Sequence, residues 1–254
     1  MLAAERARSI IDLLTKNGSV VIRELSTTFN VSEETIRRDL ERIGNADPTI
    51  IRVHGGAYKQ RGVDEDAPLD FRESIYVEEK QRIAQICIEQ VHPSQCVMLD
   101  SSTTALYIAK LIRERELTLT VITNSQRIAQ ELCESEHVSL ICIGGQLRYS
   151  TKSYIGYQAT ESIKWYHADQ AFVSCSGLHR EFGITSYNEG EARIRSAMLE
   201  QANEKFLIAD HTKFGRCAVN RMLPLSRISA IVTDQEPTTD WVTLIRDSEI
   251  RLLF

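Results

Sequence analysis

Apolar side chains recur at helical spacing in the first sixty residues of the chain. Ile10 and Leu14 lie on one face of a first helix, which should end near Asn17-Gly18 because glycine commonly follows the last helical residue. A second helix is expected to follow Ile22 and to end near Phe29. This succession predicts a small helical domain at the N-terminus.

The third helical run has the clearest pattern. Ser32 is a favourable N-cap, and Ile36, Leu40 and Ile43 recur at i, i+4 and i+7 to form one buried stripe. The polar side chains of this helix lie off the stripe and should face solvent or a partner; they are Glu34, Thr35, Arg37, Arg38 and Glu41. Asn45–Pro48 should end the helix.

A strand, a turn and a linker are expected next. Thr49–Val53 is β-branched except for Arg52, and His54-Gly55-Gly56 is typical of a turn. Residues 59–75 are largely charged and lack apolar periodicity, so we interpret them as a linker. The predicted domains are therefore 1–58 and 76–254.

From residue 76 onward, helical and strand patterns alternate. Strands are expected at 96–99, 117–122, 138–143, 170–174, 205–209, 228–232 and 249–253. Helices are expected at 76–90, 103–114, 125–134, 188–203 and 239–246. Because the strands are unbroken apolar runs, the alternation predicts a doubly wound, mostly parallel α/β sheet covered on both faces.

Composition and charge add little to this picture. The 254 residues are 43% apolar and 26% charged, as in an ordinary soluble globular protein. Residues 1–62 hold ten basic and eight acidic residues, although the whole chain carries a net charge of -5. The six cysteines are scattered singly, and no signal peptide or membrane span is apparent. We therefore expect a cytoplasmic protein with no metal and no cofactor.

The third helix could read DNA. A short helix that presents Thr35, Arg37 and Arg38 suits the major groove, where arginine can bridge guanine O6 and N7. The plainer alternative is a three-helix bundle whose arginines merely cover a solvated face. The helices taken singly do not decide between the two.

Polar residues follow several of the predicted strands, at the edge where open α/β sheets bind ligands. Asp100-Ser101-Ser102-Thr103-Thr104 opens a helix, and four hydroxyl residues at a helix N-terminus favour an anion site over a simple N-cap. Thr123-Asn124-Ser125, Gly144-Gly145 and the loop with Lys213 follow other strands. The paired glycines could be turn residues only, and Glu189 and Glu191 could be partners of a helix dipole only.

The motifs of the head resemble those of the DeoR family of bacterial repressors. The resemblance covers most of residues 3–58 and rests on Ser32-x-x-Thr35-Ile36-Arg37-Arg38-Asp39-Leu40 and on Arg52-Val53-His54-Gly55-Gly56. It implies a winged helix-turn-helix with the wing around Ile50–Tyr58, and we expect DNA contacts from Ser32, Glu34, Thr35, Arg37, Arg38, Arg52 and His54. One departure is Gly44–Thr49, where members usually have a short glycine-containing turn.

The resemblance continues through the rest of the chain. Asp-x-Ser-Thr-Thr at residue 100, Thr123-Asn124-Ser125, Gly144-Gly145 and Asp210-His211-x-Lys213 match the DeoR sensor domain, which resembles ribose-5-phosphate isomerase. It implies a phosphorylated sugar as effector. Ser101, Ser102, Thr103, Thr104 and Lys213 would surround its phosphate. Asp100, Asn124 and Glu189 would lie nearer its hydroxyls, with Ser125, Gly144 and Gly145 in the same set of loops.

These observations predict a homo-oligomeric repressor of a carbohydrate-catabolic operon that leaves double-stranded operator DNA when a sugar phosphate binds. We expect no enzymatic activity. A rival interpretation is a sugar-phosphate isomerase with an accessory DNA-binding head, in which Glu189, Glu191 and Lys213 supply acid-base groups. A third is an activator, or a regulator without a ligand, because repression and activation depend on operator position.

Overall fold

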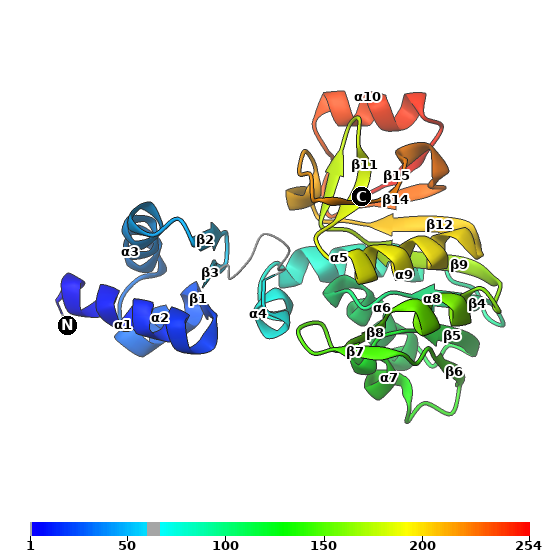
Figure 1. Ribbon diagram of the computed structural model, residues 1–254, viewed down its shortest axis with the longest axis horizontal. Helices are drawn as coiled ribbons and strands as arrows, with labels where there is room; N and C mark the ends of the chain where they lie inside the picture. The colour runs from blue at the N-terminus through cyan, green and yellow to red at the C-terminus, as the bar shows by residue number, and fades with distance from the viewer. Residues whose placement is uncertain (1, 60–66) are drawn as a thin grey trace. The chain divides into compact units, whose positions relative to one another are not determined.

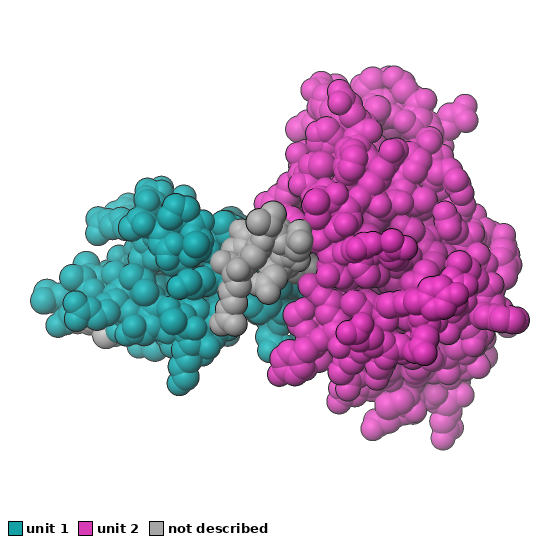
Figure 2. All heavy atoms as spheres, viewed as in Figure 1, with its two compact units in different colours: residues 1–77 teal, residues 78–254 magenta. Residues whose placement is uncertain are grey.

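A computed structural model describes residues 2–59 and 67–254. The chain divides into two compact units, Met1–Val77 and Glu78–Phe254 (Figure 2). Residues 60–66 of the expected linker lie outside the described residues. Every helix among the described residues is too short or too polar to span a lipid bilayer.

The first unit is a winged helix-turn-helix (Figure 1). Its elements are α1 (Ala3–Asn17), β1 (Ser19–Val21), α2 (Ile22–Phe29), α3 (Glu33–Ala46), β2 (Ile50–Val53), β3 (Gly56–Lys59) and α4 (Leu69–Ser74). The strands form an antiparallel sheet in the order β1-β3-β2, and we call β2, β3 and their turn the wing. The predicted end of α1 is confirmed, because Gly18 has a φ of +79° that favours glycine.

The apolar stripe predicted on α3 forms the core of this unit. Ile36, Leu40 and Ile43 are buried against Ile10 and Leu14 of α1. Gly44–Thr49, where the sequence departs from the usual DeoR pattern, begins inside α3, which continues to Ala46. Asp47 Oδ1 then accepts from the backbone N–H of Thr49 at 3.0 Å and from its hydroxyl at 2.7 Å, which turns the chain into the wing.

The second unit is built on a seven-stranded parallel sheet, as predicted. Its strands are β4 (Cys96–Leu99), β5 (Leu119–Thr123), β6 (Val138–Cys142), β9 (Ala168–Ser174), β12 (Ala202–Ile208), β14 (Ala230–Val232) and β15 (Arg251–Leu253). Their order is β15-β14-β12-β9-β4-β5-β6. The direction of winding reverses between β4 and β9, which creates a crevice at their carboxyl ends.

Helices cover both faces of this sheet, because successive strand residues point to opposite faces. Val97 and Leu99 face α5 (Val77–Ile88), α6 (Thr103–Glu114) and α7 (Gln126–Leu132). Met98 faces the other layer, which holds α8 (Tyr157–Ile163), α9 (Glu189–Glu200) and α10 (Thr239–Asp247). That layer also contains the antiparallel sheet of β10 (Gly177–His179), β11 (Gly183–Ser186) and β13 (Asn220–Leu223).

Several elements were not expected from the sequence. The hairpin of β7 (Gln146–Arg148) and β8 (Ser153–Ile155), helix α8 and the small sheet are short, so they carry few periods of any pattern. Helix α4 also lies within the stretch interpreted as a linker. It forms because Leu69 and Phe71 are buried within the first unit, although their spacing is too short to stand out among charged neighbours.

Candidate functional site

The outward face of α3 carries the arginines expected to contact DNA. Arg37 donates to Glu33 at 3.0 Å and Arg38 donates to Glu34 at 3.1 Å, one helical turn earlier. All four side chains are exposed, so these ion pairs contribute little to stability. The exposure of both arginines agrees with the prediction from the apolar stripe of α3. Their contacts with DNA remain a prediction.

The other residues expected to contact DNA include the N-cap of α3 and two residues of the wing. The hydroxyl of Ser32 accepts from the backbone N–H of Thr35 at 3.2 Å, so Ser32 is the N-cap of α3. Arg52 of the wing lies 3.7 Å from Glu41 of α3, and His54 is exposed at the turn of the wing. Arg6 and Asp39 are buried and form an ion pair at 2.5 Å between α1 and α3.

The strand-end loops named from the sequence all lie at the carboxyl edge of the seven-stranded sheet. Asp100 follows β4 at the reversal of strand order and is fully buried. Its Oδ1 accepts from the backbone N–H and the hydroxyl of Ser102, at 3.2 and 2.6 Å. Its Oδ2 accepts from the backbone N–H of Ser174 at 3.2 Å and from Arg195 at 2.8 Å. Both oxygens of Asp100 are thus engaged inside the protein.

Glu191, at the start of α9, is the centre of a second buried group. Its carboxylate accepts from the hydroxyls of Ser101 at 3.0 Å, Thr151 at 2.8 Å and Ser153 at 2.5 Å. Burial acts to raise the pKa of Glu191, but Arg195 and the three hydroxyls outweigh it and hold the pKa below its ordinary value. We call Asp100, Ser101, Thr151, Ser153, Glu191 and Arg195 the strand-end cluster.

The cluster differs from the sequence expectation at one carboxylate. Glu189 was expected near the effector hydroxyls, but its side chain is exposed and accepts from Arg193 at 2.6 Å. Glu191 faces the interior instead, because it lies on the same side of α9 as Ile194 and Met198. That i, i+3, i+7 relation is visible in the sequence and could have singled out Glu191. Thr151 and Ser153 could not be found in this way, since the β7–β8 hairpin brings them to the cluster.

The N-terminus of α6 offers groups that the cluster does not use. Ser102 caps the helix by accepting from the backbone N–H of Ala105 at 3.1 Å. Thr103 and Thr104 occupy the first turn and are nearly buried. Among the described residues, neither threonine hydroxyl has a hydrogen-bond partner. The helix dipole and these two hydroxyls together favour an anion at this point.

Asn124 contributes an unsatisfied acceptor at the end of β5. Its amide nitrogen donates to the carbonyl of Tyr154 at 2.9 Å, and the residue is fully buried. Its Oδ1 has no hydrogen-bond partner within the described ranges. A buried acceptor without a partner is costly, so the site is suited to a donor from a bound molecule. Ser125 caps α7 by accepting from the backbone N–H of Ile128 at 3.3 Å.

Lys213 brings a cation to the same edge after β12. Its Nζ lies 3.9 Å from Asp210 Oδ2 and is partly exposed. Burial acts to raise the pKa of Asp210, but Lys213 and hydrogen bonds from Thr212 hold it below its ordinary value. Cys175, after β9, is buried, and burial raises the pKa of its thiol to about 12. This residue is a packed cysteine rather than a reactive one.

The remaining loop positions are glycines. Gly145 has a φ of +155°, and a Cβ there would lie 2.8 Å from the carbonyl oxygen of Ile155 and 2.9 Å from Ala159, so the close approach of β8 and α8 requires glycine. Gly144 faces open space. The part of the chain that the structure describes contains no group of acidic, histidine or cysteine side chains placed to hold a metal ion.

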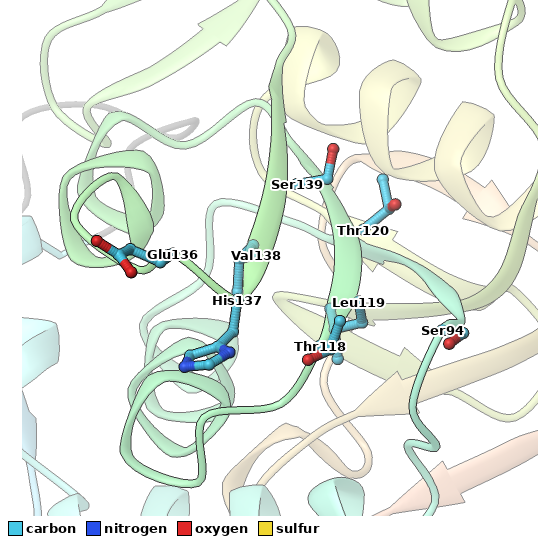
Figure 3. Close-up of a pocket in the computed structure, with 8 residues that line it drawn as sticks. All are labelled: Ser94, Thr118, Leu119, Thr120, Glu136, His137, Val138 and Ser139. Atoms are coloured by element: carbon cyan, nitrogen blue, oxygen red, sulfur yellow. The ribbon is translucent and has the colours of Figure 1, made fainter.

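The structure has a hollow at the opposite edge of the sheet, where β5 and β6 begin (Figure 3). It is lined by Ser94, Thr118, Leu119, Thr120, Glu136, His137, Val138 and Ser139. None of the residues named from the sequence lies there. The candidate site is instead the carboxyl edge, where Thr103, Thr104, Asn124 and Lys213 offer groups to a bound molecule.

Two family models match the chain, one over the helix-turn-helix and one over the α/β domain. Residues 6–60 match the DeoR-like helix-turn-helix domain, and residues 75–235 match the DeoR C-terminal sensor domain. The chain is 34% identical to the HTH-type transcriptional regulator YulB of Bacillus subtilis, over 99% of this chain and 96% of that protein. It is 30% identical to the glycerol-3-phosphate regulon repressor of Escherichia coli, over 99% of both.

A solved structure overlaps the chain in part. Ribose 5-phosphate isomerase A from Methanocaldococcus jannaschii is 18% identical and covers 53% of each chain, with a TM-score of 0.40. The assignment of the chain therefore rests on the two matching domains and on the full-length relatives.

Proposed function

The chain belongs to the DeoR family of transcriptional regulators, and on this premise we propose that it represses a carbohydrate operon until a phosphorylated sugar binds its C-terminal domain. One relative at 30% identity is named a glycerol-3-phosphate regulon repressor. Glycerol 3-phosphate is a phosphorylated polyol. Because operator DNA is cytoplasmic, the proposal also implies a cytoplasmic protein.

The observation that carries the proposal is the set of unused groups at the carboxyl edge of the sheet. The first turn of α6 presents the hydroxyls of Thr103 and Thr104 beside a positive helix end, and Lys213 supplies a cation. Asn124 Oδ1 is an acceptor that needs a donor. A sugar phosphate supplies both an anion and hydroxyl donors, so it matches the two kinds of group.

The strand-end cluster has a supporting role in this proposal. The hydroxyls of Ser101 and Ser102 already donate to Glu191 and Asp100, and both oxygens of Asp100 accept from protein groups. These three residues therefore shape the loop that leads to Thr103 and do not donate to the phosphate themselves. Thr103, Thr104, Asn124 and Lys213 remain as the binding groups. This set of binding groups is smaller than the one expected from the sequence, because the hydrogen bonds show which hydroxyls already donate to protein groups. The sequence could not separate these hydroxyls from the available ones.

Release of DNA requires only that the effector has different affinities for the DNA-competent and DNA-incompetent states. An isomerase would need a carboxylate that can exchange protons at the site. Glu191 is enclosed by three hydroxyls and Arg195, with its pKa held low, and Glu189 is exposed on the outer face of α9. We therefore propose a binding site and no catalytic activity.

Thermal-shift measurements on the full chain with pentose and hexose phosphates test the proposal, with the unphosphorylated sugars as controls. A ligand at 100 times its Kd adds roughly 2.7 kcal/mol to the free energy of unfolding. We expect one sugar phosphate to raise Tm and to release the chain from DNA, while its parent sugar does neither. Stabilisation by sugar and sugar phosphate alike would contradict the phosphate site.

A further inference from the structure

The stretch expected to be a linker contains residues that pack onto the wing. We call Leu69–Tyr76 the junction segment; it consists of α4, Ile75 and Tyr76, and α5 of the sensor domain begins at the next residue. Leu69, Phe71 and Ile75 are each less than 10% exposed, within the first unit. A free linker would leave these apolar side chains in water, so the segment is part of the DNA-binding head.

The junction segment packs closely against two glycines of the wing. A Cβ on Gly56 would lie 2.8 Å from the ring of Phe71, and a Cβ on Gly55 would lie 2.8 Å from Ile75 Cγ2. The rings of Phe71 and Tyr58 are also in contact, with centroids 6.0 Å apart. Contact with Phe71 and Ile75 is therefore one reason that the turn of the wing contains Gly55-Gly56, besides the closeness of Gly56 to the carbonyl of Val20.

Tyr76 makes a specific contact with the turn of the wing. Its hydroxyl accepts from the backbone N–H of His54 at 3.3 Å, and the two rings are stacked with centroids 6.4 Å apart. Tyr76 has a φ of +52°, a left-handed conformation that is uncommon for a bulky side chain. Such a conformation persists only where surrounding contacts hold it, which here include those with His54.

From these contacts we propose that Ile75 and Tyr76 position the wing for DNA, and that the junction segment carries the effector signal to it. The second part rests on the proposed function. Tyr76 is followed directly by α5, whose Ile83, Ala84 and Cys87 are buried in the core of the sensor domain. A change at the start of α5 therefore acts on the residue that holds the N–H of His54. Tyr76 is a positioning residue in this account and does not itself contact DNA.

Tyr76→Phe and Tyr76→Ala in the full chain test the proposal, with exposed Tyr157→Phe as the matched control. DNA affinity is measured by fluorescence anisotropy on a duplex that the wild-type chain selects from a random library. Hydrogen exchange of residues 52–58 is followed in the same proteins. Removing the hydroxyl should weaken DNA binding about fivefold, and removing the ring should weaken it more. Faster exchange at His54 should accompany both changes, while circular dichroism confirms that the head remains folded.

The signal is measured as the ratio of DNA affinities without and with the pentose or hexose phosphate that stabilises the wild type most. In Tyr76→Ala we expect this ratio to fall toward one, while the Kd of that sugar phosphate for DNA-free protein is unchanged. The inference would be overturned if both variants had the DNA affinity of the wild type, its hydrogen exchange at residues 52–58 and its ratio of DNA affinities. A wild-type chain that no sugar phosphate releases would contradict the proposed function, and the DNA affinities and exchange of the Tyr76 variants would then decide the inference alone.

Discussion

The guanidinium of Arg195 donates to Asp100 Oδ2 at 2.8 Å, and this buried ion pair lies where the strand order reverses between β4 and β9. Arg195 also lies 3.7 Å from Glu191, so one cation joins the two carboxylates of the strand-end cluster. The loop after β4, helix α9 and the β7–β8 hairpin are thereby held together at the edge where the effector is proposed to bind.

Loss of Arg195 should destabilise the chain strongly. Breaking a buried ion pair leaves an uncompensated charge and costs about 3–5 kcal/mol, so Arg195→Leu should lower the free energy of unfolding by that amount. Arg193→Leu on the same helix removes an exposed pair with Glu189 and should cost less than about 1 kcal/mol. Urea unfolding of both variants gives the comparison. Equal losses would show that the Arg195 network contributes nothing beyond a surface pair.

The stability of the chain should depend on the ionisation of Glu191. Its pKa is lowered by folding, so the stabilisation is complete above the ordinary value of 4.5 and is lost as the pH falls below it. Glu191→Gln should therefore show a smaller loss of unfolding free energy than the wild type between about pH 5 and pH 3. Urea unfolding at several pH values measures this, with exposed Glu189→Gln as the control. Parallel curves for Glu191→Gln and the wild type would contradict it.

The arginines on the outer face of α3 should contribute to DNA binding and not to folding. Arg37→Ala or Arg38→Ala removes only an exposed pair one turn apart, so the Tm should change little. A base-reading arginine should cost about 1–3 kcal/mol in binding and relax preference at one base pair, whereas a phosphate contact should lower the salt slope. Fluorescence anisotropy across a salt series separates these outcomes, with Arg246→Ala of α10 as control. Unchanged affinity in both variants would remove α3 from the interface.

Lys213→Ala or Thr103→Val should abolish induction and leave DNA binding intact. A charge-assisted hydrogen bond typically contributes about 1.5–3 kcal/mol, so the effector titration should shift by at least tenfold. Anisotropy of bound DNA during a sugar-phosphate titration measures the shift. Lys164→Ala is a matched control, because that exposed lysine pairs with Glu161 on α8, away from the strand ends. Variants that respond as the wild type does would exclude these groups from the site.

The full chain should form at least a dimer. A single short reading helix covers too few base pairs for a specific site, and paired half-sites are the usual solution. Light scattering of the intact protein at micromolar concentration should therefore give a mass above that of one 28.8 kDa chain. A monomer that still binds a specific duplex with full affinity would contradict this expectation.

Local pattern was enough to predict the main elements. The stripe of Ile36, Leu40 and Ile43 defines the outer face of α3, because a helix fixes the directions of its own side chains. The apolar strands likewise imply a parallel sheet, and parallel strands present their following loops at one edge. The sequence alone thus located the outward face of α3 and the edge that holds Thr103, Asn124 and Lys213.

Only the tertiary structure decided which polar groups remain available there. Ser101 and Ser102 are as hydroxylic as Thr103, but Glu191 and Asp100 accept from them, and Glu191 faces inward because α9 packs that side against the sheet. The β7–β8 hairpin that completes the cluster and the junction segment that holds the wing are short, so their own periodicity is weak. They are stabilised by residues distant in sequence, such as Glu191 for Ser153 and His54 for Tyr76, and such contacts exist only once the chain has folded.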